Sequence, residues 1–299
     1  MVAAPQLQDA VVTRMERHGS HFFTIGLRAG SIARQAEPGQ FVMIAVHPQL
    51  AADSGFLAIS SSWDPLLRRP FSIYRVNSAE EEIFLLGQAT GRGSRILAAA
   101  VPGQVYSVLG PLGRPFRVEP GWKHLLLVGG GAGVAPLVFA GERFAARGIA
   151  VTVLFGFRNA GSVIGWEATS AWATSRYLVT EDGSAGKKGL VTDVLRRLLA
   201  SASTTTTSTS SSGCDCGHGP APTPARFDAI LACGPAVMLK ATAELARAAG
   251  VPCQVSAERT MGCGFGVCLS CVLPRPDGSY ALVCQDGPVF ASEEVDLSG

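Results

Sequence analysis

Four cysteines near the C-terminus constrain the fold of this chain more than any other feature. Cys263, Cys268 and Cys271 follow the spacing C-x4-C-x2-C, and Cys284 comes after twelve intervening residues. This is the plant-type ligand spacing of a [2Fe–2S] cluster. We therefore expect all four cysteines to ligate one cluster, which requires the C-terminal segment to wrap tightly around it.

Glycines in the same segment support this interpretation. Gly262, Gly264 and Gly266 can adopt backbone conformations closed to other residues and let amide N–H groups approach the cluster sulfurs. The alternative is a structural zinc site with four cysteine ligands, which usually joins two short knuckles from separate turns. Because only Cys284 lies apart from the others, the spacing favours iron–sulfur over zinc.

Composition and charge exclude several classes of protein. The chain has 299 residues, of which 47% are hydrophobic and 16% charged, which indicates a globular protein of about two or three domains. The net charge of +2 predicts no nucleic-acid partner. The longest apolar run, 125–141, contains five glycines and Pro136, so we expect no membrane helix. Without a signal-peptide pattern, the eight cysteines indicate metal or redox chemistry in the cytoplasm.

The hydrophobic pattern changes along the chain. Up to about residue 118, short β-type runs alternate with Pro-Gly turns, which predicts an antiparallel barrel, and only residues 93–100 read as a helix there. From Trp122, apolar strands alternate with helical stretches, which predicts a parallel sheet. The expected fold class is therefore a multidomain β plus α/β protein: an antiparallel FAD-binding β-barrel, a parallel-sheet nicotinamide-binding domain and a small C-terminal [2Fe–2S] domain.

These patterns predict three domains with definite boundaries. The barrel is expected over 1–119, the α/β domain over 120–255 and the cluster domain over 256–299. Residues 201–225 are rich in Ser and Thr and then in Gly and Pro, so we expect a disordered surface insertion there. The insertion contains Cys214, Cys216 and His218, which could bind a metal, although a closed zinc site wants a fourth ligand.

Two short segments of the barrel half predict a dinucleotide site. Arg69-Pro-Phe-Ser72 supplies a forked donor for a pyrophosphate and a hydroxyl a few residues away, although an ordinary strand with a surface arginine would look the same. Gly91-Arg-Gly93-Ser94 opens the predicted helix, where free N–H groups can bind phosphate.

Two further segments of the α/β half favour a nicotinamide site. Gly129-Gly-Gly-Ala-Gly133 follows a strand and precedes a helix, but it departs from G-x-G-x-x-G. The next strand ends at Arg158 rather than at an acidic residue, which disfavours a classical Rossmann site. Cys233-Gly-Pro235 closes another strand at the sheet edge where ligands bind, and a buried small hydrophobe is the simpler interpretation of Cys233.

Taken together, these segments resemble the ferredoxin–NADP reductase superfamily. Arg-x-x-Ser, the glycine-rich turn and Cys-Gly-Pro-x-x-Met occur in its order and approximate spacing. The stretches 258–263, 284–290, 180–184 and 188–193 are similar to a narrower family, the electron-transfer subunits of NAD-linked dihydroorotate dehydrogenase. The resemblance covers almost the whole chain except 201–225.

The resemblance implies a set of cofactor-binding residues and no catalytic acid or base. It implies FAD held by Arg69, Pro70, Phe71, Ser72, Leu86, Gly87, Gln88, Gly93 and Ser94. It implies NAD(P) over Gly130, Gly131, Ala132, Gly133, Val134, Cys233, Gly234 and Pro235. The implied route runs from dihydroorotate to FMN on a separate catalytic subunit of a hetero-oligomer, then through [2Fe–2S] and FAD to NAD+, in de novo pyrimidine biosynthesis.

Rival functions stay open on the sequence. One is the FAD and [2Fe–2S] subunit of an NADPH–ferredoxin-linked flavoenzyme, or of a sulfide dehydrogenase-like enzyme, which would share the same motifs; Arg158 leaves NAD and NADP undecided. From other classes, a simple electron carrier would not need paired dinucleotide sites, and a zinc-stabilised binding module would purify colourless.

Overall fold

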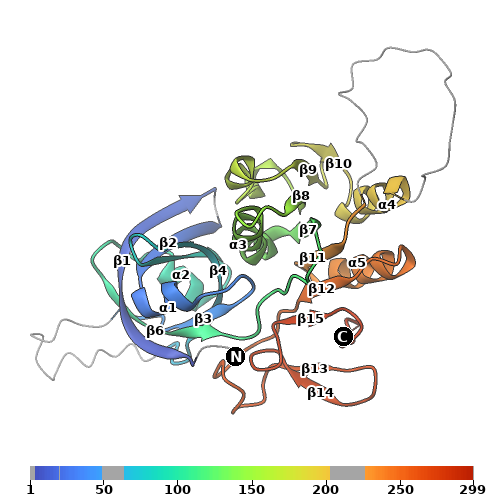
Figure 1. Cartoon of the computed structure of the whole chain (residues 1–299). Helices are drawn as coiled ribbons and strands as arrows, with labels where there is room; N and C mark the ends of the chain where they lie inside the picture. The colour runs from blue at the N-terminus through green and yellow to red at the C-terminus, as the bar shows by residue number, and fades with distance from the viewer. Residues whose placement is uncertain (1–3, 20, 49–63, 203–225, 299) are drawn as a thin grey trace, which may run out of the picture.

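A computed structural model describes residues 4–19, 21–48, 64–202 and 226–298 of the chain. A β-barrel and an α/β sheet lie side by side, and the C-terminal segment lies against both of them (Figure 1). The predicted fold class is confirmed. Residues 203–225, with Cys214, Cys216 and His218, lie outside the described residues, so the predicted insertion is described only at its first two positions.

The N-terminal half forms a closed antiparallel barrel with the strand order β1-β2-β5-β4-β3-β6. Its interior is filled by aliphatic and aromatic side chains such as Phe23, Ile25 and Leu85, which are almost fully buried. The barrel strands are β1 (Gln6–His18), β2 (Phe22–Arg28), β3 (Phe41–Ile44), β4 (Arg69–Asn77), β5 (Glu82–Gln88) and β6 (Val105–Leu112).

Two short helices accompany the barrel, α1 (Gly30–Gln35) and α2 (Arg92–Leu97). The expectation of a single helix in this half is therefore wrong. Helix α1 was overlooked because it is only six residues long and buries just Ile32 and Ala33. A helix this short has no measurable hydrophobic period in the sequence. Strand β1 lies in the region where short β-type runs were expected; its mostly exposed residues include several charges, and it carries a bulge between Val12 and Arg14.

The second half contains a seven-stranded sheet in the order β10-β9-β8-β7-β11-β12-β15. All neighbouring pairs are parallel except β12 and β15. The strands are β7 (His124–Gly130), β8 (Ala150–Phe157), β9 (Ser175–Thr180), β10 (Lys187–Lys188), β11 (Ala229–Cys233), β12 (Cys253–Ser256) and β15 (Val289–Ala291).

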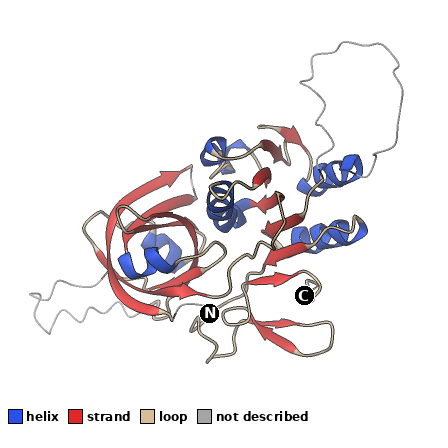
Figure 2. Cartoon of the chain, in the orientation of Figure 1, coloured by secondary structure: helices blue, strands red, loops and turns tan. Residues whose placement is uncertain are grey.

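Helices cover both faces of this sheet, as a parallel sheet requires (Figure 2). Strand β7 shows why: Leu125 and Leu127 face the α3 side, while Leu126 and Val128 face the core shared with α4 and α5. The helices are α3 (Val134–Ala145), α4 (Val191–Ala202) and α5 (Ala236–Ala248), with the short 3-10 turns η2 (Gly131–Gly133), η3 (Ala160–Ser162) and η4 (Glu167–Ala171). No helix among the described residues is long and apolar enough to cross a membrane.

Helix α3 packs against barrel strand β4 and so joins the two halves (Figure 1). A bulge between Ile73 and Arg75 interrupts the pairing of β4 with β5, and bulges re-aim side chains. Arg75 then forms a two-point ion pair with Glu142 of α3, with Nε–Oε2 at 3.2 Å and Nη2–Oε1 at 2.9 Å. The start of β4 and the start of α3, which carry predicted flavin and nicotinamide residues, are thereby fixed to each other.

The C-terminal segment is not a detached module. Its last strand, β15, pairs with β12 at the edge of the sheet, while β13 (Val272–Pro274) and β14 (Tyr280–Leu282) form a separate hairpin. The segment also contacts the barrel, because Arg114 N donates to Gly287 O at 2.6 Å. The buried cysteines Cys271 and Cys284 belong to the same core as the sheet.

Candidate functional site

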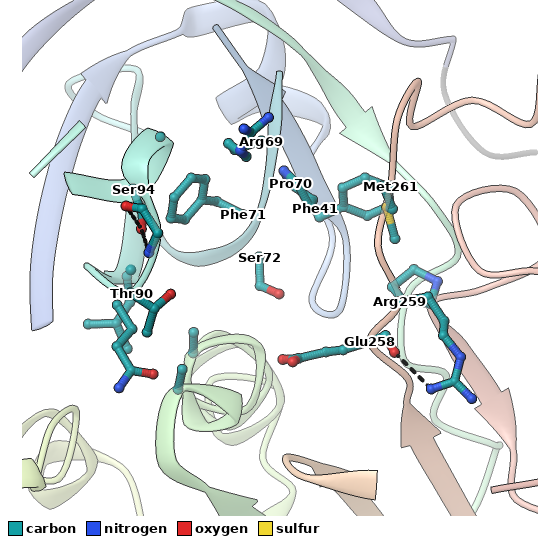
Figure 3. A pocket seen from close by; sticks show the side chains of 18 of the residues that line it. Phe41, Arg69, Pro70, Phe71, Ser72, Thr90, Ser94, Glu258, Arg259 and Met261 are labelled. Atoms are coloured by element: carbon teal, nitrogen blue, oxygen red, sulfur yellow. Dashed lines mark hydrogen bonds between the residues drawn. The ribbon is translucent and has the colours of Figure 1, made fainter. Parts of the chain in front are cut away.

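A pocket of about 460 Å³ lies where the barrel, the glycine-rich turn and the C-terminal segment meet (Figure 3). All nine residues that the sequence assigned to FAD line it. The opposite side is formed by Ala132 of η2 and Ala135 at the start of α3, by residues 256–259, and by Met261 and Pro288. The structure therefore brings the predicted flavin residues together in one place.

Arg69 occupies one end of the barrel wall, next to the start of α2. Its Nη1 donates to the carbonyl of Leu67 at 2.7 Å, and no acidic partner to it is recorded among the described residues. A Cβ on Gly93 would come within 2.9 Å of Arg69 Nε, so glycine is what lets the helix start approach the guanidinium. A forked cation beside a turn of free amides suits a pyrophosphate.

Phe71 and Gly87 shape the middle of the same wall. The Phe71 ring packs edge-on against Phe23 with centroids 6.0 Å apart. A Cβ on Gly87 would meet the Phe71 ring at 2.6 Å, so the ring can lie where it does only because residue 87 lacks a side chain. The result is an apolar wall with the Ser72 hydroxyl at its edge, which fits a flavin ring.

The predicted nicotinamide residues are arranged differently. Only Ala132 lines the large pocket, while Gly234 and Pro235 line a neighbouring cavity of about 180 Å³. The two turns nevertheless touch, because a Cβ on Gly133 would lie 2.6 Å from the carbonyl carbon of Cys233. Cys233 itself is buried, and burial raises the pKa of its thiol, as expected for a small core residue.

Glu258 borders both cavities and its role was missed from the sequence. In Figure 3 its carboxylate points into the pocket toward Ser72. Surrounding protein desolvates the carboxylate and raises its pKa, although water in the pocket still reaches the side chain. Its only signal in the sequence was its place at the start of the cysteine segment, which says nothing of where the carboxylate points.

The four predicted cluster cysteines form two pairs. Cys271 Sγ and Cys284 Sγ lie 3.3 Å apart, and the thiols of Cys263 and Cys268 interact with each other. In the described part of the chain, no three His, Cys, Asp or Glu side chains gather as they would around a single ion. Two pairs of thiols suit a two-iron cluster, in which each iron takes two cysteines.

Backbone amides point at the sulfurs, as a cluster site needs. Gly266 N donates to Cys284 Sγ at 3.1 Å, and Phe265 N and Cys268 N donate to Cys263 Sγ at 3.4 and 3.5 Å. Gly266 has a φ of +88°, a left-handed conformation that favours glycine. The donor set and its amides therefore fit a [2Fe–2S] cluster.

The two cysteine pairs differ in environment. Cys271 and Cys284 are buried at the β13–β14 hairpin, and burial raises the pKa of Cys284 to about 12. Cys268 is exposed, and hydrogen bonds from Ser270 lower its pKa to about 6. Cys268 therefore faces outward and Cys263 is half-buried, while Met261, two residues before Cys263, lines the flavin pocket.

A closed barrel and a parallel sheet that share a pocket, with an iron–sulfur loop beside it, define a flavin reductase with an iron–sulfur domain. The solved structures agree. An NADH-dependent reduced ferredoxin–NADP oxidoreductase superposes with a TM-score of 0.76 at 26% identity, covering 96% of this chain and 90% of that one. A ferredoxin NADP+ reductase from Neisseria gonorrhoeae superposes with a TM-score of 0.57 at 15% identity, covering 82% and 92%.

Sequence comparison narrows this class to one family. The electron transfer subunit of dihydroorotate dehydrogenase B (NAD(+)) from Bacillus velezensis is 38% identical over 276 residues, 91% of each chain. The subunit of the same name from Bacillus cereus is 35% identical over 298 residues, covering 98% of this chain and 99% of that one. Residues 258–296 match the iron–sulfur cluster binding domain of dihydroorotate dehydrogenase B. The chain belongs to the family of dihydroorotate dehydrogenase B electron transfer subunits.

Family membership confirms the resemblance drawn from the sequence and the function of an oxidoreductase subunit that transfers electrons. It also confirms FAD, [2Fe–2S] and NAD as the cofactors of the fold and family. The assignment of individual residues to FAD and NAD(P), and the domain boundaries, stay predictions.

Proposed function

We propose that this chain passes electrons from an FMN-containing dihydroorotate dehydrogenase subunit to NAD+ in the cytoplasm, as a step of pyrimidine synthesis. The observation that carries the proposal is the position of the cysteine loop, which directly adjoins a pocket lined by all nine predicted flavin residues. When bound, the cluster and the flavin supply the electron and hydride transfer.

The residues of the chain then have distinct tasks. Cys263, Cys268, Cys271 and Cys284 hold the cluster. Arg69 and the residues around Gly93 bind the flavin pyrophosphate, and the Phe71 wall orients the ring. The glycine-rich turn and the Cys233 turn leave backbone room for the nicotinamide cofactor. No side chain in this proposal acts as a catalytic acid or base.

The exposed rim of the cysteine loop is where we place the catalytic subunit of the hetero-oligomer. Phe265, Val267 and Leu269 stand 52%, 72% and 60% exposed around the outward-facing Cys268. Apolar side chains clustered on a surface favour protein–protein contact. A partner seated there would contact the loop beside the exposed Cys268.

We retain the three proposed domains, with one qualification. Residues 1–119 contain the whole barrel, and 120–255 contain all sheet strands except β15 and the last residue of β12. Strand β15 belongs to the third segment, 256–299, in sequence but to the sheet in hydrogen bonding. The cluster segment should therefore not fold as an independent unit.

Substitution of one exposed ligand tests the route. Cys268→Ser should abolish the cluster while FAD stays bound, so NADH should still reduce the flavin but transfer to the partner should fall to background. Flavin and iron contents, single-turnover flavin reduction and dihydroorotate-dependent NADH formation measure the three parts. Cys253→Ala, which changes a buried cysteine outside the loop, should leave the cluster in place. Intact partner transfer in a cluster-free variant would contradict the route.

The NADPH–ferredoxin-linked alternative has one specific support, the 26% identity to a reduced ferredoxin–NADP oxidoreductase. The partner separates the two functions. The chain purified with its co-eluting partner should oxidise dihydroorotate with NAD+; oxidation of reduced ferredoxin with NADP+ and no activity with dihydroorotate would favour the alternative.

A further inference from the structure

Ser270 lies between the second and third cysteines of the cluster motif and makes three polar contacts. Its Oγ is 3.2 Å from Cys268 Sγ, accepts a hydrogen bond from Gly262 N at 3.0 Å and is 3.3 Å from Thr260 O. The hydroxyl therefore joins the start of the cysteine loop to its end and touches a sulfur that the proposed cluster uses.

Counting protons limits what this hydroxyl can do. A serine hydroxyl has one hydrogen to donate and two lone pairs to accept with. Gly262 N–H takes up one lone pair, so the single hydrogen goes either to Thr260 O or to Cys268 Sγ. A cysteine that ligates iron is a thiolate and carries no proton. Once Cys268 is a ligand, a hydrogen bond between the two side chains can only run from the serine to the sulfur.

The hydroxyl hydrogen should go to the Cys268 thiolate rather than to the neutral carbonyl of Thr260. Hydrogen bonds to an ionised acceptor are roughly twice as strong as those between neutral groups, and the two distances differ by only 0.1 Å. The other three cysteine sulfurs accept backbone N–H groups, from Phe265, Cys268, Gly266 and Cys284. Ser270 adds a hydroxyl donor at the exposed Cys268, on the side where the partner is proposed to dock.

We propose that Ser270 tunes the reduction potential of the cluster by donating its hydroxyl hydrogen to Cys268 Sγ. The inference rests on the proposed cluster ligation. An added electron increases the negative charge on the sulfurs, so a donor there stabilises the reduced cluster more than the oxidised one and raises its potential. Ser270 acts through Cys268 and is a positioning residue, while electron transfer itself stays with the cofactors.

The test is a redox titration of the full-length holoprotein. Ser270→Ala should keep its iron and sulfide but show a ratio of reduced to oxidised cluster about three to ten times lower at a given ambient potential. For one electron, this is a shift of about 30 to 60 mV to more negative values. Ser270→Thr keeps the hydroxyl and should restore the wild-type midpoint. The electron paramagnetic resonance signal of the reduced cluster should change in the alanine variant alone.

A matched control is available in the same segment. The Ser279 hydroxyl donates to Asp277 Oδ1 in the β13–β14 turn, so Ser279→Ala removes a hydroxyl without touching a sulfur and should leave the midpoint unchanged. An unchanged midpoint in a fully loaded Ser270→Ala protein would overturn the proposal, since the hydrogen would then remain on Thr260 O.

A variant that loses its cluster would not leave the question open. In that case electron–nuclear double resonance on the reduced wild-type cluster should detect a strongly coupled proton that exchanges in D2O and persists in Ser270→Thr. Loss of the cluster from both variants would overturn the proposal in favour of a loop-closing role. Wild-type protein without iron and sulfide would instead refute the proposed function itself.

Discussion

The two walls of the central pocket are built from different parts of the polypeptide. The barrel wall presents side chains, among them the Arg69 guanidinium, the Phe71 ring and the Ser72 hydroxyl. The sheet wall offers little side chain, because Ala132 and Ala135 line the pocket there and the turn 129–133 contains four glycines, while the turn 233–235 packs behind it and lines the neighbouring cavity. Substitutions can change what a wall of side chains binds. The shape of a wall of backbone depends instead on how closely two turns approach each other.

The glycines of the sheet wall show this dependence. A Cβ on Gly133 would lie 2.6 Å from the carbonyl carbon and oxygen of Cys233 and from Gly234 N, all of them backbone atoms. Backbone atoms cannot rotate away as a long side chain can. We therefore expect substitutions on the sheet wall to lower the stability of the protein and to distort the binding site. Substitutions on the barrel wall should change cofactor binding alone.

The largest expected effect is that of Gly133→Val. The new Cβ would lie 2.6 Å from the carbonyl of Cys233, and overpacking of this kind costs about 3 kcal/mol at the upper end of its usual range. Thermal unfolding should move to lower temperature, and NADH-driven flavin reduction should fall with it. Gly161→Val is the control, because its Cβ would meet only Asn159 Oδ1 at 3.5 Å. Equal melting temperatures for Gly133→Val and wild type would contradict the expected difference in stability effects between the two walls.

Arg69→Ala should have an intermediate effect, confined to binding. Arg69 donates only to neighbouring carbonyls in the recorded contacts, so its loss should leave the fold intact. Loss of a hydrogen bond to a charged phosphate is worth about 1.5–3 kcal/mol, or roughly 10- to 100-fold in FAD affinity. Flavin content after dialysis and a fluorescence titration measure it. Arg117→Ala, a change of arginine outside the pocket, is the control; undiminished FAD affinity would take Arg69 out of the site.

The smallest effect belongs to Glu258, which stands where the two walls meet. Desolvation by the surrounding protein raises the folded pKa of Glu258 above the unfolded value although the side chain is exposed to the pocket, so the folded state binds the proton more tightly. The ionised carboxylate therefore lowers the free energy of unfolding as pH rises above its ordinary pKa. Below that pH it has no such effect. Glu258→Gln should be more stable than wild type at neutral pH, and the difference should shrink as pH falls toward about 4.3.

Melting temperatures across this pH range provide the measurement. Glu119→Gln, on an exposed surface residue, should follow the wild-type curve at every pH. A Glu258→Gln variant whose advantage persisted unchanged at low pH would show that removal of charge is not the cause.

Much of the fold could be predicted because local patterns were strong. Strands β2 and β7 are mostly apolar, and the cysteine spacing follows from how four sulfurs ligate one cluster. The pocket residues of the barrel were found from the two short motifs at 69–72 and 91–94, and residues 86–88 were added by the family resemblance. Helix α1 was missed because it is only six residues long, and Glu258 was missed because it gains its setting only where three parts of the chain meet.

The antiparallel pairing of β15 has a consequence for how the protein is made. The edge of β12 that faces away from β11 is covered only after residues 289–291 have been made. Until then the sheet presents an open strand edge, the kind of surface that recruits other chains. All four cysteines emerge before that last strand, so iron and sulfide can be loaded while the edge is still open. Cofactor insertion and protection from aggregation are thereby tied to the same stretch of the chain, from the cysteine loop to β15.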